Sequence, residues 1–202
     1  MKQLDNFIKT SIQQNKILCI VHAPRTGSHA LSEAIAKKYG LKEYLEIFHP
    51  KFLIDKEKIL RPSIAKICMI WNGIGSGQEE FIDDDCATIK LLRKDTDAQL
   101  ISYIRAVYTG QWHSNHDNAT INHDIDLNKM IFMGEKYNSM CDQYSTDMTV
   151  YYEDLVDNGY LNINKQYKKM STNVETEAYL QNVYRNYLKN KSSMEQKYNE
   201  QL

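Results

Sequence analysis

Short apolar runs alternate with stretches of helical periodicity along most of the chain. Uninterrupted apolar runs of this length are typical of strands that are buried on both faces of a sheet. Strands that alternate with helices predict an α/β fold, with a mainly parallel central sheet and helices on both faces. The predicted strands are residues 16–21, 64–71, 87–92 and 148–152, and the predicted helices are residues 3–14, 28–39, 96–111, 127–144 and 174–189.

In sheets of this kind, ligands bind at the carboxyl ends of the strands, where the connecting loops gather. Four loops are therefore candidates for a binding site. They are residues 22–29, 72–80, 93–99 and 153–158.

The composition predicts one ordinary domain, residues 1–202, because 42% of the residues are hydrophobic and 25% are charged. The formal net charge of -1 does not suggest a nucleic-acid partner. We find no apolar run long enough to span a membrane and no signal-peptide pattern. Four widely spaced cysteines favour reduced thiols over disulfides or zinc. We therefore expect a soluble, cytoplasmic protein without a bound metal.

The loop after the first predicted strand, residues 22–28, carries groups suited to an anion. Gly27 permits a sharp turn, and Ser28 is a suitable cap for the helix that follows. A helix N-terminus attracts anions, Arg25 adds a full positive charge, and Thr26 adds a hydroxyl. The loop lacks the pattern of a Walker A motif. Taken alone, it could also be a capped helix with a solvated arginine.

Cys19 and Arg25 have the spacing of the Cys-x5-Arg motif of cysteine-dependent phosphatases. In those enzymes the cysteine is a reactive thiolate at the base of a phosphate-binding loop. Here Cys19 lies inside the predicted strand, and no glycine occurs between it and Arg25. We expect a buried cysteine, and phosphatase chemistry with Cys19 and Arg25 is the alternative.

A second cationic position follows the third predicted strand. Arg93 lies at the carboxyl end of this strand, and Thr96 with Gln99 fits a capping box at the start of the next helix. On that helix Ser102 falls on the side opposite the apolar residues, near the face of Gln99. Arg93 and Ser102 could converge on one phosphate. A solvent-facing serine is the other interpretation.

Three stretches together resemble the sulfotransferases that use 3′-phosphoadenosine 5′-phosphosulfate (PAPS), in particular the bacterial trehalose-sulfotransferase-like group. They are Pro-Arg-Thr-Gly-Ser at 24–28, LLRKDTDAQLISYIRAVYTGQWH at 91–113 and Val-Tyr-Tyr-Glu-Asp-Leu at 150–155. The resemblance implies a P-loop-like, nucleotide-binding core and a single set of cofactor-binding residues. In the order of PAPS groups, these are Arg25, Thr26, Gly27, Ser28 and His29 for the 5′-phosphosulfate, Arg93 and Ser102 for the 3′-phosphate, Tyr152 near the adenine, and Lys169 in a basic closing loop.

The implied reaction moves a sulfuryl group from PAPS to a hydroxyl acceptor and releases 3′,5′-ADP, with no metal. The acceptor could be a sugar or other glycan, a lipid headgroup, a small metabolite or a peptide tyrosine. Arg25 would stabilise the transferred charge, and a glutamate would act as the base. Glu46 matches the family by context and Glu43 by distance from Arg25. We prefer Glu46.

Trp112 and His113 are expected to flank the acceptor. The histidines and aspartates between His113 and Asp124 have no metal-binding frame, so we expect no metal there. A nucleotide-binding module without catalytic activity remains a second alternative. The sequence predicts no oligomeric state.

Overall fold

The computed structural model describes residues 1–46, 56–69, 82–112, 121–161 and 174–201. The chain groups into two compact units. The first unit contains Met1–Lys94 and Tyr137–Asn162, and the second contains Asp95–Lys136 and Ile163–Leu202. The single-domain organisation therefore stays a prediction, and the two units are described in turn.

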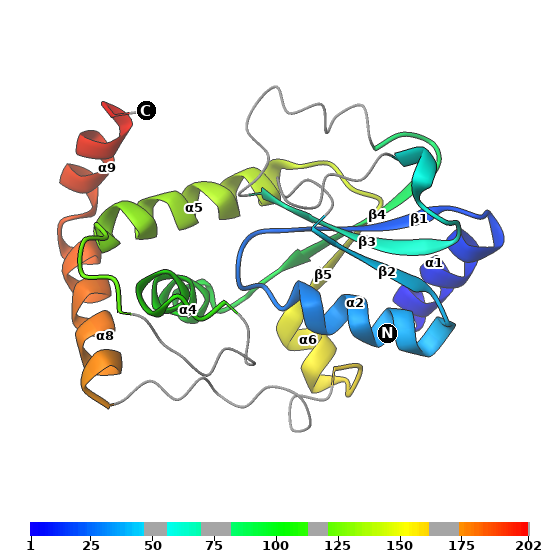
Figure 1. Ribbon diagram of the computed structural model, residues 1–202, viewed down its shortest axis with the longest axis horizontal. Helices are drawn as coiled ribbons and strands as arrows, with labels where there is room; N and C mark the ends of the chain where they lie inside the picture. The colour runs from blue at the N-terminus through cyan, green and yellow to red at the C-terminus, as the bar shows by residue number, and fades with distance from the viewer. Residues whose placement is uncertain (47–55, 70–81, 113–120, 162–173, 202) are drawn as a thin grey trace. The chain divides into compact units, whose positions relative to one another are not determined.

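The first unit contains a five-stranded parallel sheet with the strand order β2-β3-β1-β4-β5 (Figure 1). The α/β fold with a parallel sheet is thereby confirmed, and four strands lie close to their predicted positions. The strands are β1 (Ile17–His22), β2 (Lys42–Glu46), β3 (Ser63–Cys68), β4 (Cys86–Leu92) and β5 (Met148–Tyr151). The sequence analysis missed β2, because an edge strand with charged residues lacks a continuous apolar run.

Both faces of the sheet are covered, as the apolar runs predicted. Every residue of β1 and of β3 is buried. Leu18 and Ile20 pack with α1 (Lys2–Gln13), α2 (Ser28–Tyr39) and α6 (Tyr152–Asp157). Cys19 and Val21 point to the other face, where the last turns of α5 (Leu127–Gln143) contribute Cys141. The alternation along β1 thus divides the core into two layers of side chains.

The starts of two helices differ from the prediction. In α2 the N-cap is Gly27, in the left-handed region with φ of 90°, and Ser28 is the first helical residue without a side-chain capping bond. In α4 (Thr96–Thr109) the N-cap is Asp95, whose carboxylate accepts a 2.9 Å hydrogen bond from the Ala98 amide. The predicted capping box with Thr96 as the cap is therefore wrong by one residue. Aspartate is at least as good a cap as threonine, and its carboxylate also suits the positive end of the helix.

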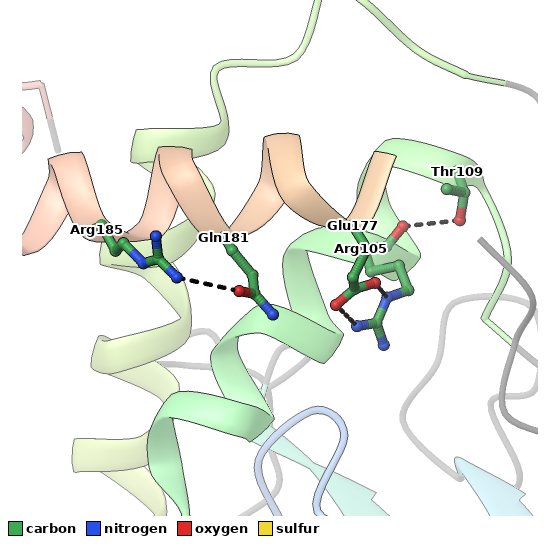
Figure 2. Close-up of polar contacts among 5 residues, drawn as sticks. All are labelled: Arg105, Thr109, Glu177, Gln181 and Arg185. Carbon is green, nitrogen blue, oxygen red and sulfur yellow. Dashed lines mark hydrogen bonds and ion pairs between the residues drawn. The ribbon is translucent and has the colours of Figure 1, made fainter. Parts of the chain in front are cut away.

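The second unit consists of α4, the first part of α5, α8 (Val174–Lys189) and α9 (Lys191–Asn199). Tyrosine hydroxyls tie its helices together through bonds of 2.8 Å, from Tyr184 to Asp97 and from Tyr187 to Glu135. Arg105 of α4 forms a two-pronged ion pair with Glu177 of α8, with its Nε at 2.9 Å (Figure 2). The second unit is thus held by buried ring packing and by charged hydrogen bonds at its helix contacts.

Across the parts of the chain that the structure describes, no helix combines the length and the apolar character needed to cross a membrane.

Candidate functional site

The loop between β1 and α2 is held in shape by its own residues. Thr26 is only 1% exposed, and its hydroxyl donates a 3.0 Å hydrogen bond to the Ala23 carbonyl. Gly27 adopts a φ of 90°, and Arg25 adopts a φ of 63°. A left-handed arginine is unusual, since its Cβ approaches the backbone there. The structure therefore keeps Arg25 in a conformation that local sterics oppose, and such conformations cluster at functional sites.

The first turn of α2 forms the floor of this loop. The first N–H groups of any α-helix have no carbonyl of an earlier turn to bind, and together they attract anions. A backbone bond at the start of α2 runs from the Leu31 amide to the Gly27 carbonyl at 3.1 Å, so the amides of residues 28–30 belong to the turn that precedes this bond. The first turn contains no acidic residue that would compensate its positive end. This end of α2 thus has the properties of an anion site.

Tyr152 brings the two predicted phosphate-binding regions into one place. It is the first residue of α6, and its ring lies against Gly27: a Cβ built on Gly27 would be 2.4 Å from the ring atom Cδ2. The guanidinium carbon of Arg93 lies 4.4 Å from the centroid of the same ring. Gly27, Arg93 and Tyr152 come from three distant parts of the sequence and belong to the first unit. The resemblance had assigned all three to the same ligand.

Glu153, next to this tyrosine, is a site residue that the sequence analysis did not single out. Its Oε1 accepts a 2.8 Å hydrogen bond from Nε of Arg93, and its Oε2 accepts a 2.9 Å bond from the backbone amide of Lys94. The ammonium group of Lys94 in turn pairs with Asp154. The available signal was the Tyr-Glu-Asp segment itself, in which only the tyrosine was given a role.

The two glutamates proposed as bases both belong to β2. Glu43 accepts a hydrogen bond from the fully buried Ser32 of α2, and its Oε1 lies 3.9 Å from Nδ1 of His29. It therefore lies beside the first turns of α2. Glu46 is the last residue of β2 and pairs with Lys66 after an irregularity in the strand. The side chain of Glu46 lies outside the described part, so its predicted role stays a prediction.

Cys19 does not have the geometry of a phosphatase nucleophile. It lies in the middle of β1 and has no solvent exposure. A hydrogen bond with Cys86 and burial raise the pKa of the Cys19 thiol well above its ordinary value. A thiolate nucleophile needs the opposite conditions, with a lowered pKa and access to the loop. The structure thus confirms the buried cysteine and argues against the phosphatase alternative.

The remaining assigned residues of the described part lie in the second unit. Ser102 is half-buried on α4, and Gln99, expected near the polar face, is buried with only 3% exposure. Trp112 is 38% exposed, and its ring meets that of Tyr103 edge-on, at 6.0 Å between centroids. Because Arg93 and Ser102 belong to different units, their convergence on one phosphate stays a prediction.

A groove of about 550 Å³ opens in the second unit, near the end of α4. The backbone amide of Asn122 donates a 2.9 Å hydrogen bond to the Tyr108 carbonyl and so holds the groove's edge against the helix. His123 lies edge-on to the Tyr108 ring, at 5.9 Å between ring centroids. The groove is lined by Val107, Gly110, Ile121, Asn122, His123 and Asp124.

Some predicted site residues fall on segments that the structure does not describe. They are His113, Lys169 and the glycine-rich loop at 72–80. Within the described ranges, no group of three or more histidine, cysteine, aspartate or glutamate side chains could hold a metal ion.

The chain was compared with protein-family models, with curated protein sequences and with solved structures. No protein-family model matches the chain. No curated protein sequence matches it either. Among solved structures, the chain is similar to mouse sulfotransferase SULT7A1 complexed with PAP, at 12% sequence identity and a TM-score of 0.41, over 88% of this chain and 68% of that one.

Proposed function

We propose that this protein is a sulfotransferase that moves the sulfuryl group of PAPS to a hydroxyl acceptor and releases 3′,5′-ADP. The observation that carries the proposal is the contact of Tyr152 with both Gly27 and Arg93. An anion-binding helix N-terminus and a cationic strand end are thereby joined by an aromatic ring. A nucleotide with charged groups at two positions and a flat base fits such a set of groups.

The described residues suggest a role for each part of the donor. The first-turn amides of α2, including those of Ser28 and His29, and the Arg25 guanidinium would bind the 5′-phosphosulfate. Arg93 would bind the 3′-phosphate together with Ser102, and the Tyr152 ring would lie next to the adenine. Thr26 would support the loop through the bond from its hydroxyl to the Ala23 carbonyl, and its predicted contact with the phosphosulfate would come from its backbone amide. Lys169 would close over the 3′-phosphate, as the resemblance implies.

Sulfuryl transfer depends mainly on positioning and on stabilising charge at the non-bridging and leaving oxygens. The acceptor oxygen forms a bond to sulfur while the bond between sulfur and the bridging phosphate oxygen breaks. Arg25 and the positive end of α2 would stabilise the negative charge that develops on the phosphate. The backbone of the loop that carries Arg25 and leads into α2 is held by the bond from Thr26 to Ala23 and by the left-handed Gly27.

We propose Glu43 as the base that takes the proton of the acceptor hydroxyl, in place of Glu46. Two contacts support this choice: the hydrogen bond from Ser32 and the 3.9 Å distance to His29 in the first turn of α2. One carboxylate oxygen is thus held by the helix that would bind the phosphosulfate. A base must lie within hydrogen-bonding reach of the reacting hydroxyl. Glu43 lies beside the first turns of α2, where the phosphosulfate is proposed to bind.

The acceptor would lie near Trp112 and His113. An exposed indole ring offers an apolar surface to a sugar, a lipid headgroup or a small metabolite. The groove beside His123 and Asp124 adds polar groups in the same unit.

The proposal is tested by incubating the protein with PAPS labelled in its sulfate group and a panel of hydroxyl acceptors. We expect transfer of label to an acceptor by the natural chain and a loss of more than about a hundredfold in Arg25→Ala. Arg61→Ala is the matched control, because Arg61 forms a surface ion pair with Asp85. Binding of 3′,5′-ADP without any transfer would identify an inactive nucleotide-binding module. If the natural chain neither binds 3′,5′-ADP nor transfers label, the proposal is overturned.

A further inference from the structure

The carboxylate of Glu153 holds two consecutive residues at the end of β4. One oxygen accepts from Nε of Arg93 at 2.8 Å and the other from the backbone amide of Lys94 at 2.9 Å. The Arg93 and Glu153 side chains are only 20% and 25% exposed, so this pair is partly shielded from solvent. Shielding makes such a charged hydrogen bond stronger and more directional than a surface ion pair.

The geometry of this bond limits how Arg93 can meet an anion. A guanidinium group can present either of two kinds of edge to a phosphate, the end with its two terminal nitrogens or a side that includes Nε. Glu153 occupies the Nε side. The guanidinium carbon also lies over the Tyr152 ring, 4.4 Å from its centroid, so the ring covers another side of the same group. An anion is therefore directed to the end with the two terminal nitrogens.

The Glu153 carboxylate also changes the electrostatic attraction between Arg93 and anions. A carboxylate beside an arginine reduces the attraction of that arginine for any distant anion. It weakens the short, two-pronged contact with a phosphate at the correct edge proportionally less, because that phosphate lies closer to the terminal nitrogens than to the carboxylate. A residue placed in this way favours an anion in one defined position over anions in general.

We infer that Glu153 is a positioning residue that makes the site selective for nucleotides with a 3′-phosphate, by orienting Arg93. The inference rests on the proposed function, because it assigns the 3′-phosphate to Arg93. Glu153 need not touch the nucleotide. Its effect is carried by the direction of the Arg93 guanidinium group and by the path of the backbone at Lys94.

The experiment compares the dissociation constants of 3′,5′-ADP and 5′-AMP, which differ only in the 3′-phosphate. Both are measured by titration calorimetry on the natural chain, Glu153→Gln, Asp154→Asn and Arg93→Ala. The ratio of the two constants is insensitive to partial unfolding, because both nucleotides bind the same folded population. Asp154→Asn is the matched control. Asp154 is the next residue along the chain, and its carboxylate pairs with the exposed Lys94 side chain, whereas the carboxylate of Glu153 binds Arg93.

We expect the natural chain to prefer 3′,5′-ADP and Arg93→Ala to lose that preference. Glu153→Gln should reduce the preference by about tenfold, since one amide oxygen cannot replace two carboxylate acceptors. Asp154→Asn should keep it within about twofold. A full preference in Glu153→Gln, or a larger one, overturns the inference and leaves the proposed function standing. A natural chain that binds both nucleotides equally, or neither, overturns the proposed function and the inference with it.

Discussion

The ring of Tyr152 fills the space beside Gly27 that a side chain at position 27 would need. A Cβ there would lie 2.4 Å from Cδ2 and 2.5 Å from Cε2 of the ring. Non-bonded carbon atoms normally approach to about 3.5 Å. Glycine at this position is therefore required twice, by the left-handed backbone and by the ring that covers it.

Gly27→Ala should consequently displace Tyr152 and weaken nucleotide binding. Gly40→Ala is a matched control, because Gly40 also has a positive φ of 67°, but a Cβ added there would meet no atom within 4 Å beyond its chain neighbours. Both variants should lose about 1–2 kcal/mol of unfolding free energy to backbone strain. Only Gly27→Ala should lose more than that, with at least about a tenfold loss of 3′,5′-ADP affinity. Equal effects in denaturant unfolding and in titration would contradict the role given to Tyr152.

Arg25 offers a test of strain at a functional position. Arg25→Ala and Arg25→Gly both remove the guanidinium and should abolish phosphosulfate binding to a similar degree. The glycine variant alone also relieves the left-handed conformation at φ of 63°. We expect its unfolding free energy to exceed that of the alanine variant by about 1 kcal/mol. Urea unfolding checks this difference, and an alanine variant as stable as the glycine variant would argue against strain at this position.

The choice of base gives a kinetic prediction. Glu43→Gln should reduce kcat by about a hundredfold or more while 3′,5′-ADP binds as before, because general bases contribute on that scale. Glu46→Gln should keep most of the activity. Ser32→Ala should lower kcat by a smaller factor at unchanged affinity for PAPS, since it removes the hydrogen bond that fixes the Glu43 carboxylate. Loss of activity in Glu46→Gln alone would return the role to Glu46.

A cluster between α1 and α2 predicts how stability depends on pH. Oδ1 of Asp5 accepts hydrogen bonds from Lys38 at 2.7 Å and from Tyr39 at 2.6 Å, and these bonds lower the pKa of Asp5 below its ordinary value of 3.8. Burial and the bond to Asp5 raise the pKa of Tyr39 from 10.0 to about 12. The Asp5 contribution is present above pH 3.8 and is lost as the pH falls through the lowered pKa. The Tyr39 contribution is complete below pH 10 and is lost as the pH rises from there to about 12.

Urea unfolding from acid to alkaline pH, across both of these ranges, measures the two limbs of this dependence. Tyr39→Phe should flatten the alkaline limb relative to the natural chain, and Asp5→Asn should flatten the acid limb. Because other carboxylates and tyrosines titrate in the same ranges, the difference between each variant and the natural chain is the relevant quantity. Unchanged slopes in the variants would show that this cluster does not contribute.

Three of the four predicted strands are buried on both faces, and the fourth, the edge strand β5, was predicted from the short apolar run at 148–152 although its residues are only partly buried or exposed. In β1, β3 and β4 the side chains on both faces are packed against other side chains, so most residues of these strands are apolar and form a continuous run in the sequence. The edge strand β2 has one neighbouring strand and carries Lys42 and Glu43, so the same signal is absent. The start of α4 was misplaced by one residue because Asp95 and Thr96 are both competent caps.

Site residues were predictable where a local pattern carried them and not where a long-range contact did. The loop at 24–28 and the stretch after Arg93 have recognisable local patterns. The bond between Arg93 and Glu153 joins positions 60 residues apart, and nothing near either residue indicates the other. The approach of Tyr152 to Gly27 is of the same kind, since it depends on α6 packing over the loop after β1.

The central claim is that the site binds a nucleotide with a 3′-phosphate through Arg93. Titration calorimetry with 3′,5′-ADP on the natural chain and on Arg93→Ala tests it most directly. We predict saturable binding of one nucleotide per chain, weakened at least about tenfold by the substitution. Absence of saturable binding by the natural chain, or equal affinities in the two proteins, would contradict the claim.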